Sequence, residues 1–222
     1  MFVGHYAVSF AARSTSVSLP LWVWFIAVQW LDVGFMTFVL TGTEKLRITE
    51  GFTESNALDL YYMPFTHGLV GAIVMSVILA AIVAVVFPAG RQPLALGLVA
   101  LASFSHWLLD LVMHTPDMPL FDDDSTKVGL GLWDHPVIGL PLELLVLALG
   151  VWLYTRSVTL TDRGTTLVWG FAGLLAVFQI YSQFGPAPTS PEAFAVTALV
   201  LYAALAAMAA WVEKRAVRTR AG

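Results

Sequence analysis

Residues 67–87 read HGLVGAIVMSVILAAIVAVVF, and no side chain after His67 in this stretch carries a formal charge. A helix needs about 20 mostly apolar residues to cross the hydrocarbon core of a bilayer. This stretch therefore predicts a membrane-spanning helix. Outward from it, the sequence holds five further stretches of similar character, at residues 21–40, 93–113, 137–154, 165–184 and 194–212. We expect an all-α polytopic bundle of six spans, with residues 1–222 forming a single integral membrane domain.

The composition agrees with a lipid environment. Of the 222 residues, 58% are hydrophobic and 12% are charged, whereas a soluble domain carries about 25% charged residues. The formal net charge of −4 argues against a nucleic-acid partner, which requires a basic surface. The chain has no cysteine, which excludes disulfides and thiolate metal ligands.

Residues 1–13 form a shorter patterned segment ahead of the first span. The segment lacks the basic start of a signal peptide. We expect a short helix, either half-length within the membrane or lying at its interface.

The basic residues predict the orientation of the bundle. In a six-span arrangement most of them fall on one side: Arg13, Arg91, Arg156, Arg163, Lys214, Arg215, Arg218 and Arg220. The opposite side carries acidic residues, among them Asp122, Asp123, Asp124 and Asp134, and only three basic ones, Lys45, Arg47 and Lys127. Lysine and arginine concentrate in cytoplasmic loops. We therefore expect both termini in the cytoplasm and a location in a bacterial inner membrane.

Ionisable residues inside the predicted spans indicate a functional site. Asp32 lies midway along the first span, His106 and Asp110 lie in the third, and Glu143 lies in the fourth. An ionisable group at the centre of a bilayer costs roughly 2.5–3.5 kcal/mol on the insertion scale. Several such groups must find partners, stay protonated or share a cation.

Helical spacing brings several of these donors together. His106 and Asp110 are four residues apart and share one helix face, which His114 continues. His67 and Asp59 stand at the outer entrance of the second span, near the level of Asp32. His5 can join them only if residues 1–13 enter the bilayer.

These donors suit a divalent metal. Nitrogen and oxygen ligands fit zinc, with manganese and iron as further choices, and fit magnesium less well. The predicted metal ligands are His5, Asp32, His67, His106 and Asp110. Asp59 and Glu143 are the predicted catalytic residues, as a general base or an additional ligand.

Each residue also has a simpler interpretation. His106 and Asp110 can form a polar pair that fixes helix packing, and Asp32 can be a protonated acid. His67 can cap its helix, and His5, His114 and His135 can be interfacial histidines. The acidic run at residues 122–124 lacks the spacing of an EF-hand loop and is interpreted as solvated.

Four short motifs resemble those of a known family: Gly4-His5, the Gln29-Trp30-Leu31-Asp32 segment, residues 62–68 (YMPFTHG), and the His106–Asp110 pair. They are similar to the bacterial membrane-bound metal-dependent hydrolases, also described as LexA-binding, inner-membrane-associated hydrolases. The resemblance covers the first half of the chain. Leu31 and Gly68 stand where that family usually has Pro and Ser, which marks a divergent member with the ligand positions kept. The resemblance implies a metal-dependent hydrolase.

The order of His, Asp, His and a His-xxx-Asp pair is also similar to that of zinc-dependent phospholipases C and related nucleases. That resemblance implies phosphoester hydrolysis by a metal-activated water, and the depth of the site is compatible with a lipid substrate. A different class stays open: a proton- or ion-coupled transporter in which Asp32, Asp110 and Glu143 titrate. A third hypothesis is a helix-bundle scaffold for a partner protein.

Overall fold

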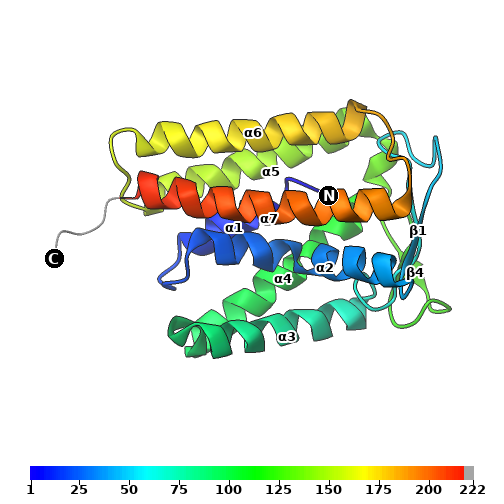
Figure 1. The fold of residues 1–222 in the computed structure, drawn as a ribbon, viewed down its shortest axis with the longest axis horizontal. Helices are drawn as coiled ribbons and strands as arrows, with labels where there is room; N and C mark the ends of the chain where they lie inside the picture. Colours follow the sequence, from blue (N-terminus) through cyan, green and yellow to red (C-terminus); the bar gives the residue numbers. More distant parts are fainter. Residues whose placement is uncertain (218–222) are drawn as a thin grey trace.

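The computed structural model describes residues 1–217, and Arg218 and Arg220 of the predicted basic side lie outside the described residues. It confirms the all-α membrane bundle. Within the described part of the chain, six helices are long and apolar enough to cross a membrane. They run side by side along the long axis of the molecule, with α3 and α6 at opposite edges (Figure 1).

The helices are α1 (His5–Arg13), α2 (Leu21–Thr41), α3 (Leu69–Val86), α4 (Pro93–Met113), α5 (Pro136–Ser157), α6 (Gly164–Phe184) and α7 (Pro191–Ala216). Two short 3-10 helices, η1 (Pro88–Arg91) and η2 (Leu132–Asp134), precede α4 and α5. The predicted third span coincides with α4. The second begins later than expected, because the amides of His67 and Gly68 both donate to the Met63 carbonyl in a turn before α3.

The short helix α1 lies inside the bundle instead of along its surface. It packs against α2, α4 and α5, and it buries His5, Tyr6 and Phe10 among other residues. Close approach to α5 depends on Gly150, since a Cβ atom there would stand 2.4 Å from the Ala7 carbonyl oxygen. Of the two predicted placements of residues 1–13, the structure has the half-length helix within the bundle.

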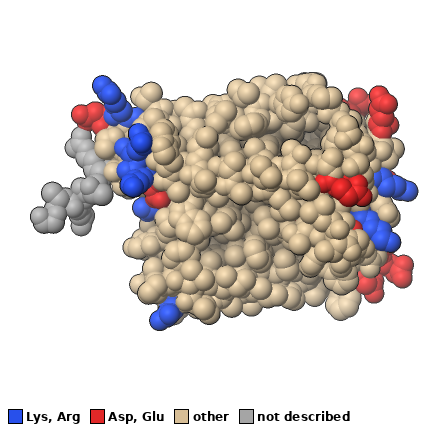
Figure 2. All heavy atoms as spheres, viewed as in Figure 1, with Lys and Arg blue, Asp and Glu red and all other residues tan. Residues whose placement is uncertain are grey.

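Charged side chains gather at the two ends of the molecule and leave an uncharged belt between them (Figure 2). At one end Arg13 pairs with Glu213, whose other carboxylate oxygen accepts the Leu21 amide at 2.7 Å. This contact ties the end of α1 and the start of α2 to the end of α7. The described basic residues of the predicted cytoplasmic side all belong to the loops and helix ends of this end.

The opposite end carries two small antiparallel sheets that the sequence did not predict. Strands β1 (Lys45–Ile48) and β2 (Leu58–Tyr62) form one, and β3 (Met118–Pro119) and β4 (Lys127–Val128) form the other. Two of the three basic residues at this end have acidic partners: Arg47 binds Asp59 and Lys127 binds Asp123. The basic charge at this end is therefore largely neutralised, in agreement with the predicted asymmetry.

Candidate metal centre

The five predicted metal ligands converge inside the bundle. His5 begins α1, Asp32 lies near the middle of α2, His67 lies in the turn before α3, and His106 and Asp110 share a face of α4. All except Asp32 are almost completely buried, and the Asp32 side chain is 15% exposed. Four separate segments thus bring imidazoles and carboxylates to one place in the membrane-spanning region.

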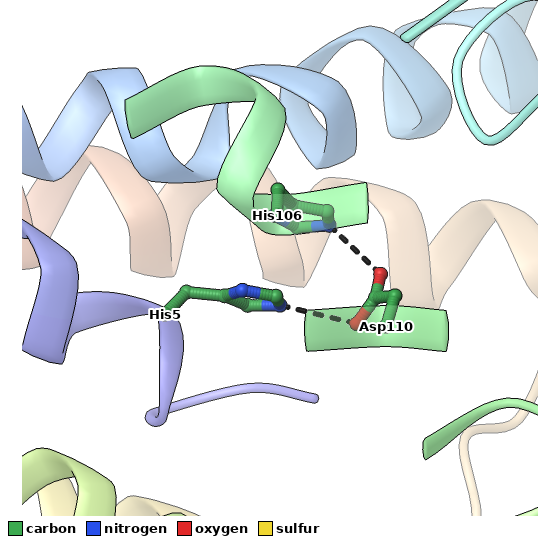
Figure 3. A group of neighbouring side chains, drawn as sticks. All are labelled: His5, His106 and Asp110. Atoms are coloured by element: carbon green, nitrogen blue, oxygen red, sulfur yellow. Dashed lines mark ion pairs between the residues drawn. The ribbon is translucent and has the colours of Figure 1, made fainter. Parts of the chain in front are cut away.

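Asp110 is at the centre of the group. Its Oδ2 atom lies 3.0 Å from His106 Nε2 and 3.5 Å from His67 Nε2. Its Oδ1 atom lies 3.2 Å from His5 Nε2 and 2.5 Å from the Met1 nitrogen. Figure 3 shows His5, from α1, and His106, from the same helix as Asp110, both directed at the Asp110 carboxylate. The imidazole rings of these two histidines stack with centroids 3.8 Å apart.

Asp32 completes the group from α2. Its Oδ1 atom is 3.4 Å from His67 Nε2 and 3.5 Å from His106 Nε2. Its Oδ2 atom accepts a hydrogen bond of 2.8 Å from the Tyr202 hydroxyl of α7. The Tyr202 hydrogen bond fixes the carboxylate so that Oδ1 faces the two histidines.

Two overlapping sets of three donors lie close enough to share an ion: His5, His106 and Asp110, and Asp32, His67 and His106. The Nε2 atoms of His67 and His106 are each 3.0–3.5 Å from one oxygen of Asp32 and one of Asp110. Zinc–ligand distances of about 2.0–2.2 Å imply that two ligands of one zinc ion in tetrahedral geometry stand about 3.3–3.6 Å apart. The side chains are therefore arranged so that this buried group can hold a metal ion.

Hydrogen bonds on the outer nitrogens orient both histidines. His106 Nδ1 is 2.7 Å from the Val28 carbonyl oxygen, so Nδ1 donates its proton there and Nε2 faces the carboxylates of Asp32 and Asp110. His106 Nε2 is buried, and within the described residues it has no hydrogen-bond partner. An imidazole held in this way can offer Nε2 to a cation in its neutral form.

His67 is oriented through Thr66 and Glu44. The Thr66 hydroxyl donates to a carboxylate oxygen of Glu44 at 2.6 Å, and it stands 2.9 Å from His67 Nδ1. The hydroxyl proton is donated to Glu44, so His67 Nδ1 donates to the Thr66 oxygen, and Nε2 is directed at Asp32 and Asp110. Glu44 also accepts the amides of Phe65 and Thr66. Burial raises the pKa of the Glu44 carboxyl, and the Thr66 hydrogen bonds oppose this shift.

Glu143, a predicted catalytic residue, binds the segment that leads into α1. Its carboxylate accepts the backbone amides of Phe2 and Gly4 at 2.9 and 3.3 Å, and the Gln179 side-chain amide at 3.2 Å. Anionic groups are favourable at the first amides of a helix. These contacts place His5 beside Asp110 and use both Glu143 oxygens.

Asp59, the other predicted catalytic residue, is not brought into the group. It lies in β2, where the strand register places it opposite Arg47. The Arg47 guanidinium donates to one Asp59 oxygen at 2.6 and 2.9 Å. Pairing of β1 with β2 therefore engages this carboxylate with an arginine at the end of the bundle.

The two remaining histidines have different surroundings. His114 is buried, with Nε2 3.7 Å from Asp110 Oδ2, Nδ1 2.9 Å from Asp117 Oδ1, and its ring against Trp133. It therefore lies at the edge of the group, as the helical spacing indicates. His135 is exposed at the start of α5.

A cavity of about 730 Å³ reaches the group from the end that carries the small sheets. Asp32, His67, Asp110 and His114 line its inner part. Binding sites for small molecules have volumes of about 300–1,000 Å³. The group is therefore accessible to a molecule larger than water.

The sequence did not single out Glu44, Thr66 or Tyr202. Glu44 lies in a polar loop, where an acid is unremarkable, and Tyr202 lies in an apolar span among many aromatic residues. Thr66 was visible only as the neighbour of His67. The contacts of Glu44 and Tyr202 depend on segments that meet only in the folded chain.

The fold and the group together define the class of the protein: a helical membrane protein whose buried His/Asp cluster can bind a metal ion. In comparisons with family models, curated proteins and solved structures, no match to this chain is found.

Proposed function

We propose that the protein is a membrane-embedded, metal-dependent hydrolase, and a divergent member of the membrane-bound hydrolase family that its motifs resemble. The observation that carries this proposal is the short spacing of imidazole and carboxylate donors: His67 Nε2 and His106 Nε2 each lie 3.0–3.5 Å from an oxygen of Asp32 and an oxygen of Asp110. Two imidazoles and two carboxylates suit zinc, and they also suit manganese or iron.

The opening of the cavity onto the site supports a catalytic role for the metal in addition to a structural one. Three of the four ligand residues, Asp32, His67 and Asp110, line the cavity. A structural zinc site has four protein ligands, whereas a catalytic site has three and keeps the fourth position for water. Asp32, His67 and His106 form a set of three donors that leaves such a position. A bound divalent ion would supply a hydroxide near neutral pH and polarise an ester or phosphoester.

The residues of the chain have separate roles in this proposal. His67 and His106 present unprotonated Nε2 atoms, and Asp32 and Asp110 present oxygens. Hydrolysis forms a bond from the water oxygen to the acyl carbon or phosphorus, breaks the ester bond, and delivers a proton to the leaving oxygen. His114, oriented by Asp117 and facing the cavity, is a candidate to handle that proton.

The charge distribution supports a location as well. Lysine and arginine concentrate on the cytoplasmic side of membrane proteins, so we place the basic end in the cytoplasm of a bacterial inner membrane. His106 and Asp110 lie in the half of α4 away from that end. The cavity then opens toward the periplasmic side.

Elemental analysis of the purified protein tests the metal site. We expect stoichiometric zinc, manganese or iron in the wild type and background levels in a His106→Ala/Asp110→Ala variant. A His135→Ala variant is the matched control, because that histidine is exposed and away from the cluster. Equal metal in the wild type and the double variant would overturn the proposal.

Two activity measurements separate hydrolysis from transport. Hydrolysis of ester and phosphoester substrates by metal-loaded protein, lost in the double variant, supports the hydrolase. Ion flux in liposomes that is abolished by Asp110→Asn, with no metal bound to the wild type, supports the carrier instead.

A further inference from the structure

The cavity extends sideways from the cluster, between α6 and α7. On α6 it is lined by Phe178 and Tyr181, and on α7 by Ala193, Thr197 and Leu201. The three α7 residues are spaced four apart and therefore form one face of the helix. Figure 2 shows a hollow on the face formed by these two helices, toward the end away from the C-terminus.

The two parts of the cavity differ in polarity. The inner part ends on Asp32, His67 and Asp110. The flank between α6 and α7 has no charged side chain among its described lining residues, and it presents Phe178 and Leu201 beside the polar Ser182, Gln183 and Thr197. α6 and α7 both belong to the membrane-spanning helices. Phe178 and Leu201 lie about two and three turns inside the ends of these helices, at the depth of the lipid chains, and the polar part of the cavity lies at the cluster.

Acidic side chains dominate the charged lining, and the Met1 ammonium that pairs with Asp110 is the cationic group beside them. The lining residues include the acids Asp32, Glu50, Glu54, Asp110 and Glu143 and no lysine or arginine. Glu50 and Glu54 lie in the loop between β1 and β2 and are exposed at the outer rim. A polyanionic head group would face these carboxylates without a basic side chain to bind it.

We propose that this cavity binds a membrane lipid, with one acyl chain between α6 and α7 and a head group that is neutral or cationic beyond its scissile ester. The inference rests on the proposed function only in placing the ester at the cluster. The lipid binding itself depends on the shape, polarity and charge of the cavity.

The environment of the chain explains why a lipid fits better than a water-soluble molecule. Lipid tails are as apolar as the side chains that they contact in a membrane protein. An acyl chain therefore moves from the bilayer to Phe178 and Leu201 at little cost, and its ester reaches the buried cluster without crossing water. A soluble substrate would have to enter past the exposed Glu50 and Glu54 and would leave the flank between α6 and α7 unfilled.

Photo-crosslinking in nanodiscs tests the chain site without requiring activity. The probe is phosphatidylethanolamine with a photoreactive group in its acyl chain. We expect labelling of α6 and α7 residues that line the cavity, reduced about tenfold in Thr197→Trp, because the indole fills the space. Val196→Trp is the matched control: Val196 is the preceding α7 residue, 51% exposed, and does not line the cavity. Equal labelling in the two variants, or labelling confined to the outer surface, overturns the lipid site.

A second probe tests the head group. We expect the phosphatidylethanolamine probe to label the cavity roughly threefold more than the anionic phosphatidylglycerol probe, because exposed like charges repel weakly. A Glu50→Gln/Glu54→Gln variant should remove this preference. A preference for the anionic probe overturns the head-group assignment.

Metal analysis of the same preparations distinguishes the two proposals. Cavity labelling without bound metal supports the lipid site and overturns the hydrolase. Stoichiometric metal without cavity labelling overturns the lipid site alone.

Discussion

The two sides of the His/Asp cluster are supported differently. On one side, His67 and Asp32 are held by side chains: the Thr66–Glu44 pair orients the imidazole, and Tyr202 holds the carboxylate. On the other side, His5 is placed by its backbone, through the Glu143 contacts to Phe2 and Gly4 and the packing of α1 on α5. Among the described residues neither His5 ring nitrogen has a hydrogen-bond partner.

This difference indicates different roles for the histidines. Hydrogen bonds on the outer nitrogen fix the tautomer and the direction of a metal-binding imidazole. His67 and His106 have such bonds, and His5 does not. His5 also approaches Asp110 Oδ1, whereas His67 and His106 face Oδ2. We therefore expect the donors around His67 and His106 to bind metal first, and His5 to orient Asp110 or to bind a second ion.

The largest effect is expected from Asp110, which both sides of the cluster share. Asp110→Asn removes a charged ligand that contacts four histidines, and we expect the metal content to fall to background. Asp59→Asn is the matched control, since Asp59 pairs with Arg47 outside the cluster. Elemental analysis of both variants measures the difference. Metal loss in Asp59→Asn of the same size would show that Asp59 reaches the site after all.

The next effect concerns the backbone placement of His5. Gly150→Val introduces a Cβ atom 2.4 Å from the Ala7 carbonyl oxygen, which forces α1 away from α5. We expect a loss of roughly 1–3 kcal/mol in the free energy of unfolding, typical of overpacking, measured by denaturation in detergent. Gly173→Val on α6 should cost little, because nothing lies within 4 Å of a Cβ atom there. Equal losses in the two variants would contradict the close packing of α1.

The side-chain support of His67 gives a third effect. Thr66→Val removes the hydroxyl that links His67 to Glu44, and the imidazole can then change tautomer. We expect metal affinity to fall about 10-fold to 100-fold, as for other residues that support metal ligands. Competition with a chelator measures this change. Thr37→Val is the control, since the Thr37 hydroxyl only binds the Val33 carbonyl of its own helix. Unchanged affinity in Thr66→Val would show that packing alone orients His67.

The smallest effect is expected at the basic end. Arg13→Gln breaks the ion pair between Arg13 and Glu213. The Arg13 side chain is 23% exposed and the Glu213 side chain is 12% exposed. We expect a loss of about 1 kcal/mol or less in the free energy of unfolding, as for partly exposed pairs, with metal content unchanged. A loss of metal in this variant would mean that the far end of α1 controls the position of His5.

The sequence predicted those parts of the molecule that depend on local pattern. The six helices followed from long apolar stretches, and the His106, Asp110 and His114 face followed from four-residue spacing. His5 could join the other donors only if residues 1–13 entered the bilayer. An amphipathic pattern does not determine whether such a segment enters the bilayer or lies at its interface. The structure places this segment inside because Gly150 lets α1 approach α5 closely.

The remaining features depend on pairings between distant segments. The role of Asp59 could not be predicted without the register of β1 and β2, which sets Arg47 opposite it. Tyr202 reaches Asp32 across 170 residues, and Glu44 reaches Thr66 across a loop that contains a strand pair. Such contacts are fixed by packing of the whole chain and leave no periodic signal in the sequence.

The position of α7 has a consequence for biogenesis. This helix is synthesised after all the segments that supply the five cluster residues, yet its Tyr202 holds Asp32 and its Glu213 holds Arg13 and Leu21. Until α7 enters the membrane, the first helices lack these partners, and the acids of α2 and α4 remain without their final surroundings. The cluster therefore reaches its final arrangement late. An ion would be bound by the fully translated chain and not by the nascent one.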